Sequence, residues 1–303
     1  MIRRYEGEEL GARPHIAVVG SDKLGNFIVT TPLLRGLRER FPGATVDFYG
    51  SPVNRAFEEA CPWIDWRTDV VPADTARAET AVAGVPERTA GHGYDLAINC
   101  DGFNPYTTEL VSRLSSRWVA GNALTADLAG PLPLGDHPNN RILADPDWTS
   151  ADFLQRYEGQ LTSNYIGELF ARMAFVETDY FAISLESAPP SFDLPDVLIH
   201  ANANRIAKLW PAGAWHDVLD WCRAHGLSVG LVGVLPKEGQ EHTIGYPIEA
   251  ELAEHAVVTD LRGRTSPIEL AGALAATRAC VTVDSGPLHV AAAVGCPTVA
   301  IFG

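Results

Sequence analysis

The sequence predicts an α/β protein with two domains, each built around a parallel sheet. A strand, a helix and a second strand follow one another closely in residues 15–49, and the same alternation restarts after the proline-rich stretch 187–195. A chain of 303 residues also has room for two cores. With 46% hydrophobic residues, 27 Gly and 21 Pro, the composition is that of a folded α/β protein rather than a disordered one.

The first domain is expected to open with a βαβ unit. A strand covers His15 to Gly20, a helix extends to Phe41, where Pro42-Gly43 ends it, and the next strand covers Ala44 to Tyr49. The loop at the crossover contains Gly25, at the position where parallel sheets usually bind ligands. Because Gly-x-Gly-x-x-Gly is absent from this unit, a nicotinamide or flavin cofactor is not indicated.

Further elements of the first domain are less regular. A helical stretch near 52–60 precedes a looser region over 62–93, and a buried strand follows over 94–100. Residues 131–146 are rich in Pro and Asn and predict a loop, whereas 151–175 predict one longer helix.

The second domain is expected to have five strands separated by helices. One helix presents an apolar stripe that includes Trp215 and Cys222, and another begins at Ser266 with a capping box to Glu269. A proline at the first helical position supports the second assignment. The expected strands cover residues 197–201, 227–233, 256–259, 279–284 and 298–302.

The last twenty residues, DSGPLHVAAAVGCPTVAIFG, combine an acidic turn, a small-residue helix and an apolar strand. The first turn of a helix exposes unpaired N–H groups and the positive end of the helix dipole. Ser285 and Gly286 therefore predict a phosphate-binding turn, and His289 lies on the same first turns. The strand after Pro297 is apolar enough to predict burial on both faces.

Three segments resemble glycosyltransferase family 9, whose best-known members are the ADP-heptose transferases of lipopolysaccharide synthesis. They are GSDKLGNFIVTTPLLRGLRERFPGATVDFYG from Gly20 to Gly50, HANANRIAKLWP from His200 to Pro211, and the terminal segment from Asp284 to Gly303. Their order and approximate spacing match those of the family, so the combination is more specific than any one segment.

The resemblance implies the GT-B fold, in which two Rossmann-like domains face each other across a cleft. It places an acceptor-side domain at 1–186, a linker at 187–195 and a nucleotide-sugar-binding domain at 196–303. The implied reaction is an inverting, metal-independent transfer of a heptose or related sugar from a nucleoside diphosphate sugar, which we expect to be ADP-linked. The acceptor would be a hydroxyl of a soluble or cell-envelope molecule.

The resemblance also assigns donor-binding roles in the second domain. Lys208, with the polar residues before it, and the turn at Ser285 would hold the diphosphate from two sides. An acidic residue after Gly233 would bind the ribose, and either Glu238 or Glu241 could serve; base, ribose and phosphate contacts together would involve Asn202, Asn204, Lys208, Glu238, Leu261, Gly263, Asp284, Ser285, Gly286 and His289.

The general base departs from the family pattern. The family commonly has Asp after Leu-Gly in the first loop, where this chain has Asn26, and an amide cannot accept a proton at neutral pH. Asp22 in the same loop and Asp101 at the end of the 94–100 strand are the two candidates. We favour Asp101, because neighbouring parallel strands open onto the same crevice. Lys23 and Gly25 would complete the acceptor-side loop.

Charge and cysteine content narrow the partners. The net charge of −15 repels nucleic acid and anionic membranes. It favours a soluble acceptor, but a charge that only keeps the protein in solution explains it equally well. Five scattered cysteines predict reduced, buried thiols in a cytoplasmic protein. Asp145-Pro146-Asp147 is interpreted as a loop rather than a metal site, so neither a metal nor another cofactor is expected. Self-association into a homo-oligomer is left open.

Two alternatives follow from the departures. Family members normally continue beyond Phe-Gly with a tail that ends in a helix, which is absent here, so the chain is either trimmed or lacks a closing element. The absent tail and Asn26 together leave a second hypothesis, that the chain is a catalytically silent GT-B protein that binds a nucleotide sugar. An epimerase of related architecture would convert the donor without any acceptor.

Overall fold

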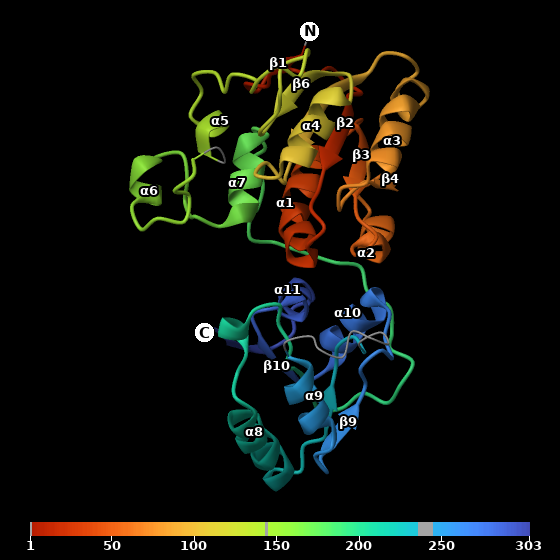
Figure 1. The fold of residues 1–303 in the computed structure, drawn as a ribbon, viewed down its shortest axis with the longest axis vertical. Helices are drawn as coiled ribbons and strands as arrows, with labels where there is room; N and C mark the ends of the chain where they lie inside the picture. The colour runs from red at the N-terminus through yellow and green to blue at the C-terminus, as the bar shows by residue number, and fades with distance from the viewer. Residues whose placement is uncertain (1, 143–144, 236–244) are drawn as a thin grey trace. The chain divides into compact units, whose positions relative to one another are not determined.

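The computed structural model describes residues 2–142, 145–235 and 245–303, and it divides into two compact units (Figure 1). Unit 1 comprises Met1–Ile183 and unit 2 comprises Ser184–Gly303. Each unit has its own sheet, and every strand pair in both sheets is parallel. The expected α/β fold with two parallel sheets is confirmed.

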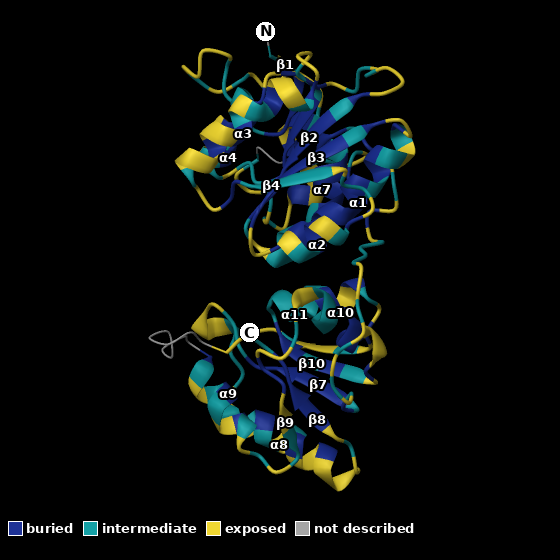
Figure 2. Ribbon diagram, turned by 90° about the vertical axis from the view of Figure 1, so that its right-hand side faces the viewer, coloured by how far each residue is buried: buried dark blue, intermediate teal, exposed yellow. Residues whose placement is uncertain are grey.

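The sheet of unit 1 has the strand order β1-β6-β5-β2-β3-β4. The central strands are apolar and buried, whereas β4 at one edge is only half-buried (Figure 2). This is the expected difference, because a central strand is covered on both faces and an edge strand is not. The strands are β1 (Arg3–Arg4), β2 (His15–Val19), β3 (Thr45–Gly50), β4 (Trp66–Asp69), β5 (Tyr94–Asn99) and β6 (Ser116–Ala120).

Helices cover both faces of this sheet. α3 and α4 pack on the face that contains Ala17 and Val19, while Phe27 of α1 meets Phe48 on the other face with ring centroids 5.6 Å apart. α7 packs beside α1. The helices are α1 (Leu24–Arg40), α2 (Arg55–Ala60), α3 (Thr75–Arg88), α4 (Pro105–Arg113), α5 (Asn139–Ile142), α6 (Phe153–Arg156) and α7 (Ile166–Met173).

Several elements of unit 1 differ from the predictions. β1, α4 and β6 were not predicted, and the loop expected over 131–146 contains the short helix α5. The looser region 62–93 contains β4 and α3, and the expected helix at 151–175 is two helices, α6 and α7. Gly159 interrupts it with φ +80°, a conformation that suits glycine. The Glu168 side chain then accepts hydrogen bonds from the N–H groups of Thr162 and Ser163, which stabilises the turn that leads into α7.

The sheet of unit 2 has the order β11-β10-β7-β8-β9. The predicted helical stripe is confirmed, since Trp215, Leu219 and Cys222 are buried in the core, and the capping box at Ser266 is present. The elements are β7 (Val197–His200), the 3-10 turn η1 (Ile206–Lys208), α8 (Ala212–Ala224), β8 (Val229–Leu231), α9 (Tyr246–Ala253), β9 (Val258–Asp260), α10 (Pro267–Ala276), β10 (Ala279–Val283), α11 (Gly286–Ala293) and β11 (Thr298–Ile301).

The expectation that the last strand is buried on both faces was wrong. β11 is the edge strand beside β10, and Val299 is 58% exposed. An apolar run predicts a strand, but it does not by itself distinguish a central strand from an edge strand. Within the described residues, no helix combines the length and the apolar character that a transmembrane span requires.

The five cysteines behave as the sequence predicts. All five lie in the described residues, none forms a disulfide, and each is buried within its unit. Burial raises the pKa of Cys222 and Cys296, and raises that of Cys280 to about 12.

Gly272 allows a close backbone contact in unit 2. A Cβ added at this residue of α10 would lie 1.8 Å from the carbonyl oxygen of Ala188, so Gly272→Ala should lower the free energy of unfolding by about 1–3 kcal/mol. Gly213 of α8 is the matched control, because a Cβ there meets no atom within 4 Å. Gly213→Ala should leave stability unchanged or raise it by up to about 1 kcal/mol. Equal thermal unfolding midpoints for the two variants would contradict the packing described here.

Candidate functional site

The predicted site residues follow the strands at which each sheet reverses its order. In unit 1 this point lies between β2 and β5, and in unit 2 it lies between β7 and β10. The loops after two such strands leave in opposite directions, so a crevice forms at their carboxyl ends. The segment 22–26 follows β2 and Asp101 follows β5, while the segments 202–208 and 284–289 follow β7 and β10.

A cavity of about 290 Å³ lies at the switch point of unit 1. Lys23, Asn26 and Asp101 line it, together with aromatic side chains that include Trp148 and Phe170. The structure therefore brings together three residues that the sequence placed on the acceptor side. The cavity offers both polar groups and apolar rings, a combination typical of small-molecule sites.

The Asp101 carboxylate is partly buried in this crevice. Burial raises its pKa, and the nearby carboxylate of Asp22 raises it further, while Lys23 and a hydrogen bond from Asn104 act in the opposite direction. Asn104 Nδ2 donates to Oδ2 at 3.0 Å, and Oδ1 has no donor among the residues that the structure describes. A carboxylate with a raised pKa and one available oxygen is suited to accept a proton.

The Asn26 side chain is held by a neighbouring residue of its own loop. Its Nδ2 donates to the hydroxyl of Ser21 at 3.2 Å, so its amide is held against the loop after β2. Gly25 precedes it in the first turn of α1, with Lys23 at the N-cap. The side chain of Lys23 is exposed and forms no ion pair with a described residue.

The turn of unit 2 that the sequence predicts to bind phosphate has a cation beside it. Lys208 Nζ lies 2.7 Å from Asp284 Oδ2, and both side chains are about one third exposed. Ser285 stands at the N-cap position of α11 without a side-chain capping hydrogen bond, and Gly286 is the first residue of the helix. Burial lowers the pKa of His289, and both Lys208 and Asp284 are close enough to affect it electrostatically. The structure thus gathers Lys208, Asp284, Ser285 and His289 in one place.

His200 was not predicted as part of this site. It ends β7 directly opposite Thr282 of β10, it is 7% exposed, and its Nδ1 lies 3.0 Å from the hydroxyl oxygen of Ser285. Burial lowers its pKa to about 4, so the imidazole is neutral at pH 7. Its position at the end of an apolar strand, just before the polar loop, was the available signal.

Glu249 was also missed, because the helix α9 that contains it was not predicted. Its Oε2 accepts a hydrogen bond from Asn202 Nδ2 at 3.0 Å, and the residue is only 1% exposed. Burial raises the pKa of Glu249 to about 7. Its other carboxylate oxygen has no hydrogen-bond partner within the described ranges. Asn202 is therefore anchored by a buried acid rather than fully free to contact a ligand.

The residues expected to bind the nucleoside differ in burial and in their hydrogen bonds. The Leu261 side chain is buried, so a contact with a base would have to use its backbone. Gly263 adopts φ +70° and its N–H donates to the carbonyl of Gly233 at 2.8 Å. Asn204 is exposed and has no hydrogen bond within the described part of the chain. Glu238 and Glu241 lie outside the described residues.

The Asp145-Pro146-Asp147 segment is a loop with its own partners. Asp145 forms an ion pair with Arg156 at 2.8 Å and accepts a hydrogen bond from the Tyr157 hydroxyl at 3.2 Å. Residues 2–142, 145–235 and 245–303 contain no group of three or more His, Cys, Asp or Glu side chains arranged to bind a metal ion.

Comparison with known proteins identifies the family. The family model "Glycosyltransferase family 9 (heptosyltransferase)" matches residues 169–303. Lipopolysaccharide heptosyltransferase 3 of Escherichia coli is 31% identical over 312 residues, which cover 92% of this chain and 80% of that protein. The chain belongs to glycosyltransferase family 9. It is therefore a glycosyltransferase.

Two further similarities extend over most of this glycosyltransferase. Lipopolysaccharide heptosyltransferase 1 of Pseudomonas aeruginosa is 25% identical over 305 residues, covering 95% of this chain and 78% of that protein. The solved structure of the E. coli ADP-heptose lps heptosyltransferase II has a TM-score of 0.67 at 20% identity and covers 95% of this chain and 85% of its own. At that identity the structural likeness establishes the fold alone.

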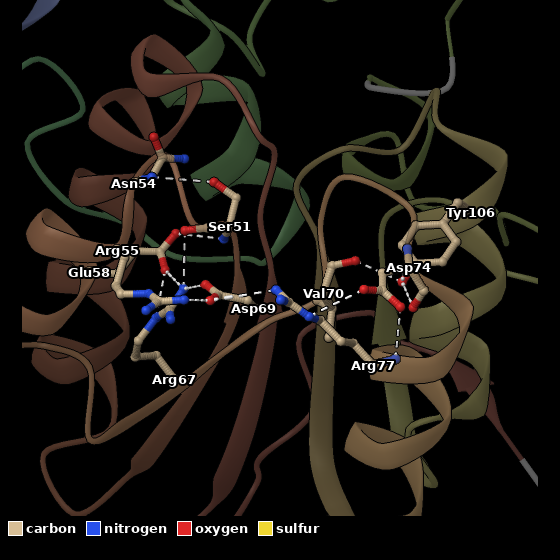
Figure 3. Close-up of polar contacts among 10 residues, drawn as sticks. All are labelled: Ser51, Asn54, Arg55, Glu58, Arg67, Asp69, Val70, Asp74, Arg77 and Tyr106. Atoms are coloured by element: carbon tan, nitrogen blue, oxygen red, sulfur yellow. Dashed lines mark hydrogen bonds and ion pairs between the residues drawn. The ribbon is translucent and has the colours of Figure 1, made fainter. Parts of the chain in front are cut away.

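A second polar cluster of the glycosyltransferase lies at the β4 edge of unit 1 (Figure 3). Glu58 is fully buried, accepts hydrogen bonds from the Ser51 N–H at 3.1 Å and from Arg67 Nε at 2.8 Å, and forms an ion pair with Arg67. Arg67 also forms an ion pair with Asp69, and Asp69 in turn lies 3.8 Å from the guanidinium of Arg77. A cavity of about 640 Å³ lies beside this network.

The network is expected to stabilise unit 1. Glu58→Gln removes the negative charge from a buried ion pair, although Arg67 keeps Asp69 as a partner. Burial raises the pKa of Glu58 to about 7, so the charge itself adds little, but Gln turns an N–H group toward Arg67 where Glu58 offered an acceptor. We therefore expect the free energy of unfolding to fall by about 1–3 kcal/mol, the cost of leaving buried hydrogen-bonding groups without a partner. Denaturant unfolding measures this change. Glu79→Gln, at an exposed partner of Arg113, is the control and should cause no measurable change; an equally small effect of Glu58→Gln would show that the buried pair adds nothing.

Proposed function

We propose that this glycosyltransferase transfers a heptose or related sugar from an ADP-linked donor to a hydroxyl group, with inversion and without a metal ion. The observation that supports it most is the Lys208 ammonium, held beside Asp284 at the N-terminal end of α11. The names of its relatives support a heptosyl donor and an acceptor of the lipopolysaccharide type. The acidic charge of −15 favours a soluble acceptor at least as well.

The donor diphosphate would bind at the switch point of unit 2. Negative charge grows on the diphosphate as the anomeric bond breaks, and fixed donors aimed at it lower the barrier. Lys208 supplies a cation, Ser285 a hydroxyl, and α11 the N–H group of Gly286 and its positive dipole end. Pro287 has no N–H, and the N–H of Leu288 already donates to the Ser285 carbonyl. Lys208, Ser285 and Gly286 supply the charge stabilisation that a metal ion gives in other transferases.

The acceptor would bind in the cavity of unit 1, with Asp101 as general base. The acceptor oxygen forms a bond to the anomeric carbon while the bond from that carbon to the diphosphate oxygen breaks, and the diphosphate leaves with the electron pair. The acceptor proton passes to Asp101, whose raised pKa suits this role. Attack on the face opposite the leaving group inverts the anomeric centre.

Removing the cation tests the donor site. Lys208→Met should lower kcat/KM for the nucleotide sugar by about 10²–10³-fold, the usual cost of losing one group that stabilises a developing anion. Steady-state kinetics with a panel of ADP-, UDP- and GDP-sugars measures this effect. Arg223→Met removes an exposed charge from α8 and should leave the kinetics unchanged. Similar kinetics for Lys208→Met and the wild type would refute the role given to Lys208.

Changing the proposed base tests the chemical step. Asp101→Asn should lower kcat by about 10²–10⁴-fold, because the acceptor proton loses its base, while ADP binding stays intact. Asp22→Asn removes the neighbouring carboxylate and should have a much smaller effect. If Asp22→Asn abolishes turnover and Asp101→Asn does not, the two roles are exchanged. Isothermal calorimetry with ADP separates binding from turnover in both variants.

One observation favours a second candidate, a nucleotide-sugar-binding protein without transferase turnover. An amide at Asn26 stands where the family commonly has the base, and it is bonded to Ser21. Such a protein would show heat stabilisation by nucleoside diphosphates but neither transfer nor hydrolysis of any donor. Turnover above background, lost in Asp101→Asn, would exclude it.

A further inference from the structure

The Ser285 hydroxyl has three polar neighbours in unit 2. It donates to the carbonyl of Val283 at 3.1 Å, and its oxygen lies 3.0 Å from Nδ1 of His200 and 3.4 Å from the hydroxyl oxygen of Thr282. The Thr282 hydroxyl donates to the same Val283 carbonyl at 3.0 Å. A hydroxyl has a single proton, so these contacts limit how Ser285 can use it.

The contact between Ser285 and His200 Nδ1 allows two proton arrangements: Ser285 donates to a bare Nδ1, or Nδ1–H donates to the Ser285 oxygen. We take the second arrangement, in which the Ser285 proton is directed to the Val283 carbonyl. The neutral ring then has its proton on Nδ1. A serine oxygen that accepts from His200 must direct its own proton elsewhere.

We propose that His200 is a positioning residue that fixes the Ser285 hydroxyl as a hydrogen-bond donor to the diphosphate of the donor sugar; the inference rests on the proposed function. When a phosphate oxygen arrives, the Ser285 proton turns from Val283 to that oxygen. The Val283 carbonyl keeps its bond from Thr282, so no buried acceptor loses its last partner. This rotation of the hydroxyl therefore costs little free energy. By donating to the Ser285 oxygen, His200 excludes the orientation in which Ser285 would present a lone pair to the phosphate.

A different use of the same pair is excluded by its surroundings. A serine next to a histidine resembles a nucleophile with its base, which requires a histidine that readily accepts a proton. His200 is buried with a pKa near 4, and no carboxylate of the described residues hydrogen-bonds to its ring. It is thus a poor proton acceptor and a good fixed donor.

Four variants of the full chain test the inference: His200→Leu, His200→Asn, Ser285→Ala and the double variant His200→Leu/Ser285→Ala. Binding of ADP, UDP and GDP is measured by calorimetry, and thermal unfolding is followed for each protein. His200→Leu should weaken binding of the preferred nucleotide about 3- to 10-fold, as expected for one hydrogen bond. His200→Asn retains an N–H near the position of Nδ1 and should restore most of the affinity.

The double variant gives the decisive comparison. If His200 acts through Ser285, the double variant binds no more weakly than Ser285→Ala alone. Additive losses, wild-type affinity in His200→Leu, or an Asn variant as weak as the Leu variant would each overturn the inference. His216→Leu, at a half-exposed histidine of α8, is the control and should not change nucleotide affinity. A wild-type protein that binds none of the three nucleotides would contradict the proposed function itself, and the inference would fall with it.

Discussion

Parallel strand pairing at the two switch points is the constraint on which both candidate sites depend. β2 pairs with β5, with Val19 opposite Asn99, and β7 pairs with β10, with His200 opposite Thr282. Parallel strands end at the same edge, so loops that are far apart in the sequence emerge side by side. In each unit, the backbone hydrogen bonds between paired strands therefore fix where the polar residues at the strand ends lie.

Both sites place polar groups where burial is costly. Glu249 is 1% exposed and one of its carboxylate oxygens has no partner among the described residues, and the pKa of Asp101 is raised by burial. Groups of this kind are unfavourable for folding unless the surrounding structure is stable enough to hold them. The apolar core around Trp215 supplies that stability in unit 2, and the buried Glu58–Arg67 pair belongs to the support of unit 1. In each unit, the candidate site residues and these stabilising contacts are therefore different groups.

The sequence predicted most of the short apolar strands and missed several elements of mixed composition, including the internal strand β6. β2, β3 and β7 are short apolar runs, and periodicity identifies such strands well. The edge strand β4 and the helix α3 were missed because both mix polar and apolar residues without a clear period. The motifs located Lys208 and Ser285, but not His200, whose contact with Ser285 spans 85 residues and exists only through strand pairing. Residue type can indicate a phosphate site; the groups behind it require the fold.

Because all five thiols are buried, the folded protein should not react with cysteine reagents. Thiolates, not thiols, react with maleimides and oxidants, and burial both blocks access and disfavours the thiolate. A cysteine introduced on the surface of either unit would then be the single labelled position. One such cysteine in each unit would allow a pair of fluorophores to report the distance between the two labelled positions, without first removing any native residue.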